Sequence, residues 1–306
     1  MPRIVSLIAS ATEIVAALGQ LDHLVGRSHE CDYPEAVKAL PVCTRPRIDL
    51  NANSSEIDAA VKRSGRTSVS IYDVFADVIE VLRPTHILTQ IQCGVCAVSL
   101  RDVEQALARG ITGQPQIVSL QPDSLAQIWE DIRRVASALG VAARGEQVAA
   151  ELRERMCQRA ARSPARQTPT VACIEWMEPL MAAGNWTPEL IGLAGGINLF
   201  GRPGEHSPWL SWNDLRTADP DILIIAPCGF DIPRTASELH WMTDRPGWNH
   251  LRAVRSGRTY LADGNQYFNR PGPRVVETLE AIVEMLDPAR TEFRLRGTVW
   301  RGIMSM

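Results

Sequence analysis

Several features that would point directly to a function class are scarce or missing in this chain of 306 residues. No apolar run approaches the roughly 20 residues needed to span a bilayer. Lys and Arg form neither an excess nor a block, and the net charge of -3 argues against a nucleic-acid or anionic-membrane partner. The GxSxG, GxxxxGKS and HExxH motifs are absent as well. The sequence therefore gives little support to a hydrolase and predicts a protein that is not an enzyme.

Cysteine is sparse, and its number is odd. The 7 cysteines of this long chain do not resemble the dense, even framework of small secreted domains, so they fit a reducing compartment. The first residues, from Met1 to Ile8, enter a buried-strand pattern that leaves no room for the parts of a signal peptide. We therefore expect a cytoplasmic protein. The alternative is a periplasmic protein whose export signal has been removed.

What the chain does contain is an alternation of apolar strand patterns and helical patterns. Ile4 to Ile8 reads as a strand, and Ser10 and Glu13 have the spacing of a capping box at the start of the next helix. Further alternation runs to about residue 121, which predicts a parallel sheet with right-handed crossovers. We expect residues 1–121 to form an N-terminal α/β lobe.

A long helical stretch follows this first lobe. Between Ser124 and Arg162 the pattern is helical throughout, with Gly140 dividing it, and a second strand and helix series begins near residue 168. We expect residues 122–167 to form a helical linker and residues 168–306 a C-terminal α/β lobe with a tail. The predicted fold class is α/β, with two Rossmann-like lobes joined by a rigid interdomain helix. The alternative is a helix packed inside one large domain.

One strand-to-loop phrase occurs in both halves. Pro84 to Gln90 leads to Cys93-Gly94, and Pro220 to Pro227 leads to Cys228-Gly229. Loops beyond the carboxyl ends of parallel strands are where ligands bind in open α/β sheets. We expect both loops to lie on the walls of one cleft.

Aromatic side chains recur in the predicted loops of both halves. Large rings suit a flat or bulky organic ligand, because each ring contributes much contact area. A single loop Trp is more often a core residue, but five aromatic loops are harder to explain in that way. The residues in question are Tyr33, Trp176, Trp186, Phe230 and Tyr267.

The pair Cys93 and Cys96 has CxxC spacing between a predicted strand and a predicted helix, where a thiol pKa is lowered. Three interpretations stay open. The pair is a redox dithiol, part of a soft-metal site with cysteines from other loops, or a set of thiols packed beneath a ligand loop. One CxxC motif without a second does not decide among them, so the metal site is unknown.

In these residues and their order, the chain resembles the cobalamin-binding members of the periplasmic-binding-protein superfamily whose two lobes are joined by a rigid helix. That group also holds iron-siderophore and heme binders. The resemblance covers nearly the whole chain. Its most specific stretches are Ile4 to Glu13, Glu30 to Pro34, Ile87 to Ser99, Glu175 to Gly196 and Asp263 to Arg274.

The resemblance implies a substrate-binding protein of the ABC-transporter type that holds a small-molecule ligand between two lobes. The expected ligand is a corrinoid or a similarly bulky, tetrapyrrole-like molecule; no cofactor is required. If the protein is exported, an ABC permease is the implied partner. The five aromatic residues would stack on the ligand, while Asp263, Asn265 and Arg270 would bond its polar groups. If cobalt were ligated directly, Cys93 or Cys96 would be the candidates.

The competing hypothesis is a cytoplasmic thiol-metal or redox protein. It would use the cysteines of the predicted cleft loops, which are Cys31, Cys93, Cys96 and Cys228.

Overall fold

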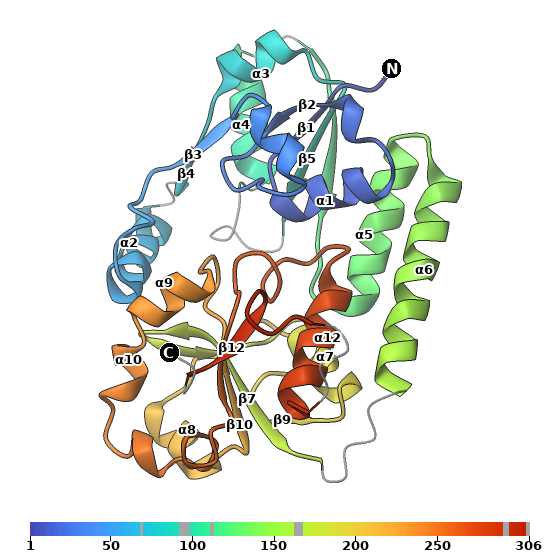
Figure 1. Ribbon diagram of the computed structural model, residues 1–306. Coiled ribbons are helices and arrows are strands. Elements are labelled where there is room, and N and C mark those ends of the chain that lie inside the picture. The colour runs from blue at the N-terminus through green and yellow to red at the C-terminus, as the bar shows by residue number, and fades with distance from the viewer. Residues whose placement is uncertain are drawn as a thin grey trace. The chain divides into compact units, whose positions relative to one another are not determined.

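The computed structural model describes residues 1–67, 70–91, 98, 100–110, 113–161, 168–289 and 294–303. The chain divides into two compact units. Unit 1 consists of Met1–Ala52, Glu56–Pro122 and Ala126–Glu151, and unit 2 consists of Asn53–Ser55, Asp123–Leu125 and Leu152–Met306. Each unit has its own sheet, which confirms the expectation of two α/β lobes (Figure 1). The expected domain limits at residues 121 and 167 stay a prediction.

Unit 1 is built on a parallel sheet with strand order β2-β1-β5-β6. Its strands are β1 (Ile4–Ser6), β2 (Leu24–Arg27), β5 (His86–Gln90) and β6 (Gln116–Leu120). A separate antiparallel pair, β3 (Thr44–Pro46) and β4 (Tyr72–Val74), belongs to the same unit. The helices of this region are α1 (Ala9–Ala17), α2 (Ser54–Thr67), α3 (Ala76–Leu82), α4 (Leu100–Gly110), α5 (Leu125–Ala138) and α6 (Ala142–Ala161).

Buried residues follow one another along the central strands β1 and β5, and successive side chains point to opposite faces, so both faces of the sheet are covered. Val5 and Ile87 pack with Ile79 of α3 and Val103 of α4 on one face. Ser6 points the other way and accepts a hydrogen bond from Thr12 of α1 at 2.9 Å. Helices thus cover the sheet on both sides, as a buried parallel sheet requires.

The expected capping box at Ser10 is wrong. Helix α1 begins at Ala9, and its N-cap residue Ile8 has no side-chain cap. The Ile8 carbonyl already accepts from the backbone N–H of Thr12 at 3.2 Å, so Ser10 lies inside the first turn. A side chain inside the turn cannot cap it.

Gly140 separates α5 from α6, as the sequence predicts, and has φ +75°. The two helices pack closely in unit 1, because a Cβ at Gly145 of α6 would lie 2.4 Å from the Cβ of Ala136 of α5. The boundary between the units falls inside α6. In its second half, Arg155 and Arg159 donate to the buried carboxylate of Glu280, at 2.7 and 2.8 Å.

Unit 2 is built on a sheet with strand order β12-β11-β10-β7-β8, and β9 pairs with β7. Strands β7, β10 and β11 run parallel, whereas β8 and β12 are antiparallel to their neighbours. The strands are β7 (Thr170–Met177), β8 (Leu180–Ala182), β9 (Ile197–Asn198), β10 (Ile222–Ile225), β11 (Thr259–Ala262) and β12 (Trp300–Gly302). The helices are α7 (Thr187–Leu193), α8 (Trp212–Ala218), α9 (Ile232–Ser237), α10 (His240–Thr243), α11 (Arg252–Arg255) and α12 (Val275–Leu286).

The core of unit 2 lies on both faces of this sheet. Ile174, Ile225 and Leu261 pack with residues of α8 to α11, including Leu215 and Met242. On the opposite face, α12 is buried over almost its whole length. The tail after Pro288, to which the sequence assigns no role, adds β12 to the edge of the sheet. Within the described residues, no helix combines the length and apolar character that crossing a membrane requires.

Asp221 links the beginnings of β7 and β10. Its carboxylate accepts from the backbone N–H and the hydroxyl of Thr170, at 2.9 and 2.8 Å, and from Arg252 at 2.7 Å. The Thr170 N–H, followed by the Arg252 guanidinium, lowers the pKa of Asp221 from 3.8 to about 2. The ionised form therefore stabilises the folded state above pH 3.8, and this contribution is lost as the pH falls towards 2.

We predict that Asp221→Asn lowers the free energy of unfolding by about 1 to 2 kcal/mol at pH 7, because hydrogen bonds to a charged acceptor are lost. The deficit relative to the wild type should shrink as the pH is lowered through the same window. Urea denaturation at a series of pH values measures it. Asp244→Asn, at an exposed site, is the control and should change little. A deficit that is the same at every pH would contradict the assigned role.

Candidate functional site

Two loops meet at the carboxyl edge of the sheet in unit 2. One follows β10 and contains Phe230, and the other follows β11 and begins at Asp263. The backbone N–H of Gly264 donates to the Phe230 carbonyl at 2.9 Å. A Cβ at Gly264 would lie 2.0 Å from the Pro227 carbonyl oxygen, so only glycine allows this approach. The strand order therefore places the residues of both loops next to one another.

Aromatic rings cluster beside these loops. The rings of Trp176 and Phe230 are 5.3 Å apart and tilted by 57°, and the guanidinium of Arg234 lies 4.9 Å above the Phe230 ring. Trp176, which the sequence places in a loop, is part of β7, because the chain continues into the antiparallel strand β8. Its indole N–H donates to the Glu178 carbonyl at 3.0 Å. Trp176 is partly buried and Phe230 is 5% exposed, so Trp176 supplies most of the accessible ring surface of this pair.

A further aromatic residue, Trp209, was missed by the sequence reasoning. Trp176 pairs with Met181 across β7 and β8, and Met181 in turn bridges to Trp209. Residues opposite one another on neighbouring strands share a face of the sheet. Trp209 is 58% exposed, which is unusual for so large an apolar side chain. The signal was available, since Trp209 also lies in a loop of the second half.

Polar groups of the β11 loop form their own network. The Asp263 carboxylate accepts from the backbone N–H groups of Asn265 and Gln266, at 2.8 and 2.6 Å. The buried Arg270 donates to the Asn265 side-chain oxygen at 3.3 Å. Burial raises the pKa of Asp263 in spite of these hydrogen bonds. Tyr267 lies in the same loop, with the Arg274 guanidinium 4.8 Å above its ring.

The predicted residues are therefore not all brought together. Trp176 and Phe230 form one contact, and Asp263, Asn265, Tyr267 and Arg270 share one loop of unit 2. Trp186 precedes α7 and is 5% exposed, the same fraction as Phe230, so burial alone does not separate these two residues. Tyr33 belongs to unit 1, follows β2 and is 44% exposed. The roles of all these residues in ligand binding stay predictions.

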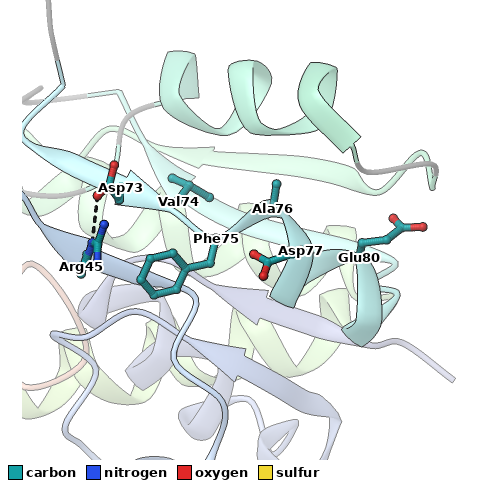
Figure 2. A pocket seen from close by; sticks show the side chains of 7 residues that line it. All are labelled: Arg45, Asp73, Val74, Phe75, Ala76, Asp77 and Glu80. Atoms are coloured by element: carbon teal, nitrogen blue, oxygen red, sulfur yellow. Dashed lines mark hydrogen bonds and ion pairs between the residues drawn. The ribbon is translucent and has the colours of Figure 1, made fainter.

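A separate hollow of about 690 Å³ lies in unit 1 (Figure 2). In the lining of this hollow, Arg45 Nε donates to Asp73 Oδ2 at 2.9 Å, and Arg47 Nε donates to Oδ1 of the same carboxylate at 2.6 Å. The hydrogen bond from Arg45 is the main reason that the pKa of Asp73 is lowered. Among the residues that the structure describes, no predicted ligand residue lines this hollow, and two arginines bind its Asp73 carboxylate, so we assign it no ligand.

Three of the cysteines that the structure describes, Cys31, Cys43 and Cys173, do not have the character of reactive thiols. Cys31 is buried and accepts from the Thr12 hydroxyl at 3.0 Å, and burial raises its pKa. Burial likewise raises the pKa of Cys43 to about 12 and that of Cys173. Cys228 is half-buried. Cys93 and Cys96 lie outside the described residues. Among the residues that the structure does describe, no group of three or more side chains could hold a metal ion.

We predict that iodoacetamide at pH 8 labels Cys157 in the native protein well before Cys31, Cys43 or Cys173. Cys157 is exposed on α6, whereas the other three thiols are buried and protonated. Peptide mass spectrometry of a time course measures each site separately, and denaturation should make all four reactive. Labelling of a buried thiol at the rate of Cys157 would contradict the structure.

Comparison with known proteins places the chain in a family. The sequence profile described as "Periplasmic binding protein" matches residues 4–265. A vitamin B12-binding protein from Vibrio parahaemolyticus is 23% identical over 296 residues, which covers 93% of this chain and 88% of the relative.

Solved structures show the same fold. A periplasmic heme-binding protein from Roseiflexus sp. RS-1 is similar, with a TM-score of 0.67, 25% identity and coverage of 94% of this chain and 99% of the other. The periplasmic vitamin B12 binding protein of Vibrio cholerae gives a TM-score of 0.66 at 21% identity, covering 94% and 97%. The chain belongs to the periplasmic binding protein family.

Proposed function

We propose that this protein binds a corrinoid, or a similarly bulky tetrapyrrole-like molecule, as the substrate-binding protein of an ABC transporter. In this proposal the ligand lies in a cleft between the two lobes and is released unchanged. The observation that carries the proposal is the Trp176 and Phe230 pair beside the polar loop from Asp263 to Arg270. In a member of this family, that combination suits a large flat ring with polar side groups.

Each group of residues at the carboxyl edge of the sheet in unit 2 has a role in the proposal. Trp176 and Phe230 supply apolar contact with the macrocycle, and the Arg234 guanidinium keeps the Phe230 ring in place. Asn265 and Arg270 bond polar groups at its rim, in a loop that Asp263 organises. Tyr33, a residue of unit 1, adds a further aromatic contact with the ligand.

The location and partners follow from the same proposal. Relatives described as periplasmic favour a periplasmic location over the cytoplasmic expectation. The ligand is then cargo rather than a cofactor, and an ABC permease is the partner that receives it. If the metal were ligated directly, Cys93 or Cys96 would be the candidates.

We predict that Trp176→Ala weakens binding of cyanocobalamin about tenfold or more, because a buried ring contact at the centre of a site is lost. Trp176→Phe is the matched control, since it keeps an aromatic ring, and should retain most of the affinity. Titration followed by visible absorbance and tryptophan fluorescence measures both variants. Equal affinity of Trp176→Ala and the wild type would contradict the proposed contact.

The thiol-metal alternative makes a different prediction. Corrinoid binding should give an absorbance change that survives Cys93→Ser combined with Cys96→Ser; with thiol ligation of cobalt, the change would shift but not vanish. The alternative predicts stoichiometric zinc or iron that the same substitutions abolish. Metal analysis of both proteins, together with the titration, decides between them.

A further inference from the structure

A second hollow, of about 300 Å³, lies in unit 2 at the carboxyl end of β11. Its polar lining includes Asp231, Asp263, Thr298 and Arg301. Asp231 is the N-cap residue of α9, and Asp263 directly follows β11. Arg301 comes from β12, where it pairs with Leu261. Strand β12 therefore brings the tail of the chain to the same sheet edge as the candidate site.

The two carboxylates of the hollow are held in place by backbone donors. Asp231 Oδ1 accepts from the Arg234 N–H at 2.7 Å, and Asp263 Oδ1 accepts from the loop N–H groups already described. Within the part of the chain that the structure describes, no hydrogen bond occupies the Oδ2 atom of either residue. Each carboxylate thus keeps an oxygen for an external donor.

Arg301 is left without a matching acceptor. Its Nε–H is buried and has no hydrogen-bond partner among the residues that the structure describes. Arg301 also forms no ion pair with any carboxylate in the described ranges, although two carboxylates line the same hollow. A buried donor without a partner costs free energy, so an incoming acceptor at this guanidinium would be favoured.

The charge balance selects the kind of group that fits. Two carboxylates and one guanidinium give the lining an excess of negative charge. A ligand carboxylate would meet like charges, and an ammonium group would leave Arg301 without an acceptor. A neutral primary carboxamide avoids both problems, because its oxygen accepts from the guanidinium while its NH₂ donates to the carboxylates.

We propose that this hollow is a subsite for a primary carboxamide, formed by Asp231, Asp263 and Arg301. The inference rests on the proposed function and makes it more specific. A corrinoid carries carboxamide side chains around its ring, whereas heme carries two carboxylates. The subsite therefore favours a corrinoid over heme, and the tail of the chain takes part in choosing the ligand.

The test compares cyanocobalamin with derivatives in which one peripheral amide is hydrolysed to a carboxylate. The wild type should bind cyanocobalamin about tenfold more tightly than at least one of these acids.

Asp231→Asn keeps the helix cap and removes one negative charge, so it should reduce that preference several-fold. Arg301→Met should weaken cyanocobalamin about tenfold. Arg296→Met, on the same tail but outside the hollow, is the matched control and should bind like the wild type.

A small probe tests the subsite independently of the large ligand. Propionamide should shift the NMR signal of the Arg301 Nε–H in the full chain, and propionate at the same concentration should not. If cyanocobalamin binds but its preference and the propionamide shift are both missing, the subsite is wrong and the proposed function stands. If no tetrapyrrole binds while propionamide still shifts Arg301, the proposed function is wrong and the subsite stands. A shift by propionate alone would overturn the subsite as well.

Discussion

Parallel pairing of β7, β10 and β11 is the constraint on which the candidate site depends. Because the three strands run in one direction, the segments that follow them leave the sheet at the same edge. The hydrogen bond between Gly264 and the Phe230 carbonyl then joins two of these segments directly. Aromatic contact area and polar groups are therefore neighbours in space although they are far apart in the sequence.

The sequence predicted the long, apolar elements well, because their burial is visible in local periodicity. The strands near Ile87, Ile174 and Ile224 and the division of the helical region at Gly140 agree with the structure. Short edge strands such as β8 and β12 were not found, since each depends on pairing with a neighbour rather than on its own composition. The error at Ser10 has a similar origin, because the hydrogen bonds that begin α1 are set by the preceding strand.

For the site, the sequence could name candidates but not their surroundings. The residue types of Trp176 and Phe230 suggested ligand contact, yet only the fold shows that the two rings meet. The same residue-type argument applied to Trp186, which the structure places before α7 and outside that ring contact. Arg301 could not be proposed at all, because its position depends on the return of the tail to β11. Burial works against the thiol hypothesis too, since it raises the pKa of Cys31 and protects it.

The chain belongs to the periplasmic binding protein family, and the residues of its candidate site lie at one edge of the sheet in unit 2. The most direct measurement is native mass spectrometry of the protein mixed with one equivalent of cyanocobalamin, followed by recovery of the ligand. The account predicts a complex of one protein with one corrinoid and a ligand of unchanged mass. A protein that carries only zinc or iron, or that returns a chemically altered corrinoid, would contradict it.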